Sequence, residues 1–242
     1  MSRPIGPWRA LAALILAYAV FNTGLQLSRP WLVGLIHPSD AMHMAFFRLA
    51  TSSIFLWLML GVVALVMRAR GGRLADLGFN RRGAVAGWIA AAIVCALQSA
   101  MFIVGPIGHA PWLSDWSALR IASAVMVAVS AGVCEETIFR GFIMTQAKQA
   151  GLPLWAQILA SALLFGAAHA GWGFLEGHAN LPAVIGAMVS TAILGGMLAV
   201  AYALARRSLW PVIVAHGLID LIAEPWLMLF ALGGGFSGHM GK

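Results

Sequence analysis

Residues 44–67 read MAFFRLATSSIFLWLMLGVVALVM, and Arg48 is the one charged residue among them. A helix needs about 20 apolar residues to cross the hydrocarbon core of a bilayer. The stretch is therefore long enough to form a membrane-spanning helix. It predicts that lipid, rather than water, is the main solvent for this part of the chain.

Further stretches of the same apolar character follow along the chain. They are residues 11–25, 84–104, 121–133, 154–168, 183–204 and 210–232. An eighth element is expected in residues 31–36 or in residues 139–150, although neither piece is long enough to span a membrane alone. The predicted fold class is all-α, a polytopic transmembrane bundle of seven to eight helices.

The overall composition agrees with a membrane protein. Of the 242 residues, 61% are hydrophobic and 10% are charged, whereas soluble domains carry charge on about 25% of their residues. We predict a single integral membrane domain over residues 1–242. Cys95 and Cys134 both fall within predicted helices, so no disulfide framework is indicated.

The formal charge of +7 does not indicate nucleic-acid binding, because the basic residues are not gathered into one patch. They sort by membrane side, as the positive-inside tendency expects. With a cytoplasmic N-terminus, the cytoplasmic face receives Arg3, Arg9, Arg68, Arg70, Arg73, Arg81, Arg82, Lys148, Arg206 and Arg207. The opposite loops are poor in Lys and Arg, with Arg29 and Arg120 as exceptions.

Charged residues follow the fourth apolar stretch, which continues as CEETIFR over residues 134–140. A charged side chain at the bilayer centre costs roughly 3 kcal/mol or more, so such residues usually face a cavity and serve function. Glu136 and Arg140 lie four apart on one helix face and can pair. Glu135 points about 100° away around the axis. It is therefore the better candidate for a general base.

Two later stretches each contribute a polar site of their own. The fifth ends at His169, one turn after Phe165, and the seventh carries His216 and Asp220 one turn apart on a shared face. If these side chains converge with Glu135, they form a polar cavity within the membrane that is able to bind and activate a water molecule.

The patterns Glu-Glu-x-x-x-Arg, Phe-x-x-x-His and His-x-x-x-Asn/Asp, on successive late membrane helices, resemble the CPBP family of intramembrane endopeptidases. This family includes the type II CAAX prenyl endopeptidases and the bacterial Abi proteins. The resemblance covers about residues 131–220 and places a protease core at about residues 117–232. It implies that Glu135 and His169 activate the attacking water. His216 and Asp220 would stabilise the oxyanion, with Glu136 and Arg140 in a supporting role.

At the position of Asp220, the best-known eukaryotic members of this family carry Asn. An Asn amide can donate a hydrogen bond to an oxyanion, and an ionised Asp cannot. Two hypotheses follow. Either Asp220 is protonated, or it orients His216, which then acts as the donor.

Other chemistries remain open at this point. Glu135, His169 and His216 could form a zinc site with an open position, but the sequence lacks the His-Glu-x-x-His spacing of helical zincins. We favour a metal-independent enzyme without a cofactor. The alternative from another class is a catalytically inactive bacteriocin-immunity or scaffold protein. A transporter would predict paired half-helices and internal repeats, and neither is seen in the sequence.

The expected partners are the lipid bilayer and a peptide or protein substrate, membrane-embedded or prenylated, with no nucleic acid. The Ala- and Trp-rich composition is typical of a bacterial protein, so we expect the cytoplasmic (inner) membrane. One difficulty is depth. At about 1.5 Å per residue, Glu135 and His169 lie roughly 20 Å from the cytoplasmic ends of their helices, and His216 lies nearer 10 Å. Straight parallel helices would not bring these three residues level.

Overall fold

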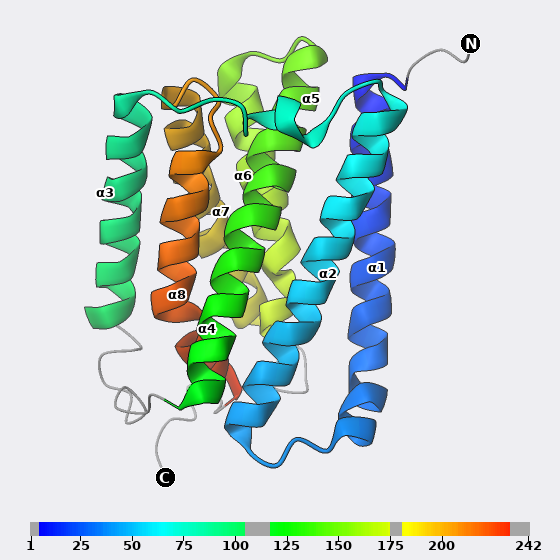
Figure 1. The fold of residues 1–242 in the computed structure, drawn as a ribbon. Helices are drawn as coiled ribbons and strands as arrows, with labels where there is room; N and C mark the ends of the chain where they lie inside the picture. The colour runs from blue at the N-terminus through cyan, green and yellow to red at the C-terminus, as the bar shows by residue number, and fades with distance from the viewer. Residues whose placement is uncertain (1–4, 105–116, 175–180, 233–242) are drawn as a thin grey trace.

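In a computed structural model that describes residues 5–104, 117–174 and 181–232, the chain folds into a bundle of helices (Figure 1). No strand occurs in these residues. Six of the helices are long and apolar enough to cross a membrane. They are α1 (Pro7–Ile36), α2 (Ala41–Ala69), α3 (Val85–Phe102), the continuous helix Ala118–Gln149, α6 (Leu154–Ala168) and α7 (Leu181–Leu204). The seventh long helix is α8 (Trp210–Leu232). The predicted all-α membrane bundle is confirmed.

The fourth long helix does not end at residue 133, as the hydropathy predicted. It runs as α4 (Ala118–Ser130), two π-helical segments η4 (Ala131–Glu135) and η5 (Thr137–Ile143), and α5 (Met144–Gln149). Residues 139–150 are therefore mostly the continuation of this helix and not a separate element. The helix continues past its charged residues because Glu136 pairs with Arg140 and with His216 inside the bundle.

The first helix is also longer than predicted, and residues 31–36 form its last turns. Pro30 lies inside α1, where membrane helices tolerate proline because neighbouring side chains satisfy the freed backbone groups. The Ser28 hydroxyl donates to the Leu25 carbonyl at 3.0 Å. Arg29, read from the sequence as part of an outer loop, is buried in this helix.

Polar contacts organise the connections between helices. Asp40 caps α2, since its carboxylate accepts from the His43 backbone N–H at 2.9 Å. This hydrogen bond is the main cause that lowers the pKa of Asp40 to about 2. After α2 comes a short 3₁₀ helix η1 (Leu74–Leu77), and the residues that follow η1 contact the start of α8. There the Trp210 indole N–H donates to the Phe79 carbonyl at 3.0 Å.

Burial in the bundle fits a lipid-facing exterior. Large apolar side chains are exposed on the outer helices, among them Leu27 at 76%, Leu65 at 69% and Val85 at 73%. The fully buried side chains, in contrast, include Arg140, Glu136 and Gln146. Exposed apolar surface of this extent indicates contact with a membrane or a partner, and the length and composition of the helices favour the membrane.

Glycines allow α8 to approach η4 closely. A Cβ at Gly132 would come 2.9 Å from the Ile213 carbonyl oxygen, and one at Gly217 would come 3.0 Å from the Ala128 carbonyl oxygen. Small residues let the backbones of membrane helices approach each other in this way. As a result, His216 on α8 reaches the carboxylates that follow Gly132.

The depth difficulty is resolved by the unequal ends of the helices. Figure 1 shows the turn between α5 and α6 lying beyond the level at which α3 and α8 begin. Counting residues from the start of α8 therefore underestimates how deep His216 lies below the level of this turn. The side chains of Glu135 and His216 come within 3.8 Å of each other.

Candidate active site

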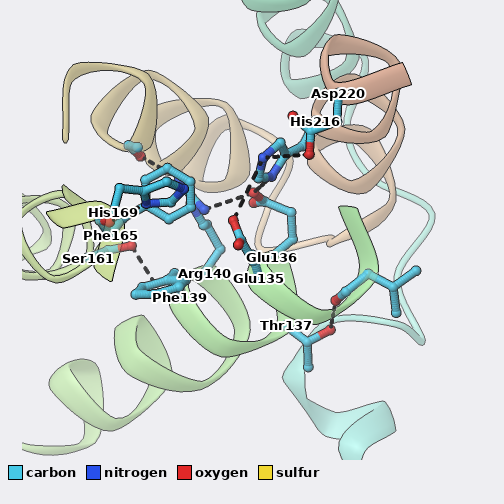
Figure 2. A network of polar contacts seen from close by, with 12 residues as sticks. Glu135, Glu136, Thr137, Phe139, Arg140, Ser161, Phe165, His169, His216 and Asp220 are labelled. Carbon is cyan, nitrogen blue, oxygen red and sulfur yellow. Dashed lines mark hydrogen bonds and ion pairs between the residues drawn. The ribbon is translucent and has the colours of Figure 1, made fainter. Parts of the chain in front are cut away.

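The two adjacent carboxylates lie where the fourth long helix is π-helical. Side-chain hydroxyls bond back to the helix here, with Ser130 donating to the Met126 carbonyl at 2.8 Å and Thr137 to the Val133 carbonyl at 2.6 Å. π-helical turns inside α-helices occur frequently at functional sites. In Figure 2, Glu135 and Glu136 both extend from this helix toward the polar cluster.

Glu136 is the centre of a buried polar network. Its Oε1 accepts from Nη1 of Arg140 at 2.8 Å and from Nδ1 of His216 at 2.7 Å (Figure 2). Glu136 and Arg140 are both fully buried, and His216 is 3% exposed. The predicted pair of Glu136 and Arg140 therefore forms, and it also holds the imidazole of His216.

Arg140 joins the fourth long helix to two other helices. Its Nη2 donates to the Gly195 carbonyl on α7 at 3.0 Å, and its guanidinium carbon lies 4.4 Å from the centre of the Phe165 ring on α6. A cation at this distance from an aromatic face is attracted by the ring quadrupole. Arg140 is thus fully buried among these contacts. This environment fits a structural role better than direct contact with a substrate.

The second nitrogen of His216 faces two more carboxylates. Its Nε2 lies 3.8 Å from Oε2 of Glu135 and 3.6 Å from Oδ2 of Asp220. These separations are ion-pair distances and are too long for hydrogen bonds. Since Nδ1 is occupied by Glu136, Nε2 is the nitrogen of His216 that remains available for other groups.

His169 lies on the opposite wall of the site, at the start of the 3₁₀ helix η6 (His169–Phe174). Its Nδ1 donates to the Phe165 carbonyl at 2.8 Å. Because a carbonyl oxygen only accepts, Nδ1 must carry the proton, so Nε2 holds the lone pair in the neutral ring. The Phe165 ring contacts both imidazoles, with centroid distances of 4.6 Å to His169 and 5.7 Å to His216.

A cavity of about 530 Å³ joins these side chains. Glu135, His169, His216 and Asp220 all line it, together with largely apolar residues from α1, α2, α6, α7 and α8. Oε2 of Glu135 is buried there and has no hydrogen-bond partner among the described residues. A buried carboxylate oxygen without a partner is costly, and a water molecule in the cavity would satisfy it.

Two charged residues of this cavity were not predicted from the sequence as site residues. Glu224 lies one turn beyond Asp220 on α8, and Arg29 comes from α1. The spacing of four residues between Asp220 and Glu224 is a signal that could have identified Glu224. Arg29 was missed because the first helix was expected to end before it.

The donors do not form an evident metal site. Within residues 5–104, 117–174 and 181–232, no group of three His, Cys, Asp or Glu side chains is arranged to hold a metal ion. Glu135, His169 and His216, considered above as zinc ligands, line one cavity but do not converge in this way.

Comparison with known proteins finds one family, over the part of the chain that holds this site. Residues 115–222 match the family model described as type II CAAX prenyl endopeptidase Rce1-like. The match includes every predicted site residue from Glu135 to Asp220 and is consistent with the CPBP resemblance. No curated protein and no solved structure matches the chain.

Proposed function

Because residues 115–222 match the Rce1-like family model of type II CAAX prenyl endopeptidases, we propose that this integral membrane protein hydrolyses a peptide bond with a water molecule activated by Glu135 and His169. One observation carries the proposal. Glu135, with an unpartnered carboxylate oxygen, and His169, with its Nε2 lone pair free, line the same cavity inside the bundle.

The reaction needs a base, a water molecule and a donor for the oxyanion. The water hydrogen-bonds to Glu135 and to Nε2 of His169, and its oxygen attacks the carbonyl carbon of the scissile bond. Its proton passes to the Glu135 carboxylate as the tetrahedral intermediate forms. When the intermediate collapses, the C–N bond breaks and this proton goes to the leaving amine. Water attack of this type produces no acyl-enzyme.

His216 is the donor that we assign to the oxyanion. Its Nδ1–H is used by Glu136, and Nε2 faces the carboxylates of Glu135 and Asp220. Carboxylates accept and do not donate, so Nε2 interacts favourably with them when it carries a proton. In that form His216 is an imidazolium. A positive donor held in a water-poor site stabilises developing negative charge strongly.

Asp220 acts through His216 in this mechanism, as a carboxylate 3.6 Å from Nε2. We expect Asp220→Asn to lower kcat by roughly tenfold to a hundredfold across the pH range, because the imidazolium loses a nearby negative charge. The measurement is a pH profile of peptide cleavage. A gain in activity at neutral pH would instead favour the other hypothesis, in which Asp220 is protonated and donates directly.

Metal independence is the second part of the proposal. It is supported by the lack of three converging ligands in the described residues and by a base, Glu135, that needs no Lewis acid. The test is cleavage of a fluorescent peptide by purified protein in detergent, before and after treatment with a chelator. Equal rates are expected. Loss of cleavage on chelation, with recovery on added zinc, would contradict metal independence. Absence of cleavage in both samples would contradict the proposed endopeptidase activity.

The proposed location is the bacterial cytoplasmic membrane, with the N-terminus inside. Basic residues at one end of the bundle support this orientation. Arg70 contacts the Ile5 carbonyl near the N-terminus, and Nη1 of Arg81 donates to the Arg206 carbonyl at 2.8 Å. These arginines therefore gather on one membrane face, which the positive-inside tendency assigns to the cytoplasm.

A further inference from the structure

A second pocket shares no lining residue with the active-site cavity, and the proposed function uses none of its side chains. It measures about 250 Å³, and three basic residues line it, Arg81, Lys148 and Arg207. We call it the basic pocket. Asp76 is the one acidic residue among the described residues that line it. The basic pocket therefore gathers more positive than negative charge.

The three cations of the basic pocket are not neutralised by the protein. In the part of the chain that the structure describes, no carboxylate forms an ion pair with Arg81, Lys148 or Arg207. The Asp76 carboxylate is used elsewhere, because its Oδ2 accepts from the Arg73 backbone N–H at 2.8 Å. Charges of one sign that line a hollow raise the local concentration of oppositely charged ligands. The basic pocket should therefore attract an anion.

Arg207 is held at the wall of the basic pocket by neutral groups. Its Nη2 donates to Oε1 of Gln157. The Gln157 amide is itself fixed, because its Nε2 donates to the Leu152 carbonyl at 2.7 Å. The guanidinium carbon of Arg207 lies 5.9 Å from the centre of the Tyr202 ring. Nη1 is buried and has no hydrogen-bond partner among the described residues. A buried donor without a partner is costly, and an anion in the pocket would offset this cost.

The turn between α7 and α8 places arginine where glycine is favoured. Arg206 and Arg207 have φ angles of 54° and 62°, in the left-handed region that residues with a Cβ adopt at a cost in free energy. The Arg207 backbone N–H donates to the Tyr202 carbonyl at 2.9 Å. The Ser208 hydroxyl donates to the Arg81 carbonyl at 2.7 Å. These bonds hold the turn in place. Strained residues cluster at ligand-binding sites, so the conformation of Arg207 fits a role in contact with a ligand.

The basic pocket lies at the level of the lipid head groups. Lys148 lies in the last turn of α5, Arg207 follows the end of α7, and Arg81 precedes the start of α3. Figure 1 shows these helix ends on the side of the bundle where α1 begins. Because the apolar spans end here, the pocket lies beside the phosphates of the bilayer surface. Basic pockets between membrane helices on the cytoplasmic side bind phosphate-bearing head groups.

We propose that the basic pocket binds a phosphate group, held by the guanidinium groups of Arg207 and Arg81 and by the Lys148 ammonium group. A planar guanidinium matches two phosphate oxygens at once, and lysine adds a compact positive charge. The volume of about 250 Å³ is below the range of about 300–1,000 Å³ for small-molecule pockets. It therefore suits a head group better than a whole lipid or a peptide. This inference goes beyond the proposed function and does not depend on it.

The test measures binding by isothermal titration calorimetry to the purified full-length protein in an uncharged detergent. The probes are short-chain phosphatidylglycerol, short-chain phosphatidylcholine and inorganic phosphate. Wild type should bind phosphatidylglycerol more tightly than phosphatidylcholine, because the three cations of the pocket repel the choline group. R207Q should weaken the binding of phosphatidylglycerol roughly 10- to 100-fold, since charge-assisted hydrogen bonds are lost. R207K should keep part of the affinity.

R206Q is the matched control. Arg206 is adjacent to Arg207 and also has a positive φ, but it does not line the basic pocket. R206Q should keep the wild-type affinity. K148Q leaves the contact between Arg207 and Gln157 intact and should weaken binding about fivefold. Thermal unfolding checks that each variant is folded, and K148Q decides if R207Q is not. Equal losses in R206Q and in the pocket variants would show attraction to the whole basic face and would overturn the inference.

The phosphate has two sources that the probes distinguish, an anionic phospholipid and free phosphate. The depth of the pocket favours the lipid, so phosphatidylglycerol should bind more tightly than inorganic phosphate. Inorganic phosphate that binds at least as tightly and displaces the lipid would instead assign the pocket to free phosphate. Both results support a phosphate site. A wild type that binds neither probe would overturn the inference, as would wild-type affinity in both R207Q and K148Q.

Discussion

Replacing Glu135 with Gln is expected to lower peptide cleavage by roughly 100- to 10,000-fold, the range over which a positioned general base contributes. Gln keeps the size of the side chain and its ability to hydrogen-bond water, but it cannot take up the proton of the attacking water. Since Oε2 of Glu135 has no hydrogen-bond partner in the described residues and Gln has nearly the same shape, the variant should remain folded. The measurement is single-turnover cleavage, with thermal unfolding as the check on folding.

Glu224→Gln is the matched control for this variant. Glu224 lines the same cavity, so the change replaces another carboxyl group in the same surroundings. Its activity should stay within about tenfold of wild type, because the proposed mechanism gives Glu224 no proton to transfer. Equal losses in the two variants would show that the cavity merely needs negative charge, and Glu135 would not be the base.

Arg140→Met should have the largest effect on stability. The change leaves the Glu136 carboxylate buried without its closest cation and removes the hydrogen bond to the Gly195 carbonyl. Breaking a buried ion pair by removing one partner costs about 3–5 kcal/mol. We expect a large fall in the thermal unfolding temperature in detergent, together with loss of cleavage, because Glu136 also holds His216.

The double variant E136Q/R140M tests the cause of that fall. It removes the buried negative charge as well, so it should be more stable than R140M alone, although His216 would still lose its anionic acceptor. Arg48→Met is a control for loss of an arginine elsewhere in the bundle, and it should have a much smaller effect. An R140M protein as stable as wild type would contradict the network described around Glu136.

The helices themselves could be predicted from hydropathy, because lipid demands long apolar segments wherever the chain crosses it. Their ends were less certain for a physical reason. Hydropathy penalises charges, whereas the structure places Arg29 and the carboxylates of Glu135 and Glu136 inside the bundle. Their partners, Ser52 and His216 among them, lie far away in the chain. A local pattern cannot identify such partners, so two helices continued further than expected.

The meeting of the predicted site residues around one cavity was easier to predict than their contacts. The motif spacing selected Glu135, His169 and His216, and the structure places all three on one cavity. The sequence did not reveal that Glu136 binds His216, or that Nδ1 of His169 is fixed by the Phe165 carbonyl. Both contacts depend on helix rotation and on the π-helical turns. Glu224 could have been found from its spacing to Asp220, but no motif includes it.

The central claim is that Glu135 and His169 act together on one water molecule, and a double-mutant cycle tests it most directly. Single-turnover cleavage of the same peptide is measured for wild type, E135Q, H169N and E135Q/H169N. Residues that act as a unit are strongly non-additive, so the double variant should be no slower than the slower single variant. Losses that multiply in the double variant would show two independent contributions and would contradict the shared water.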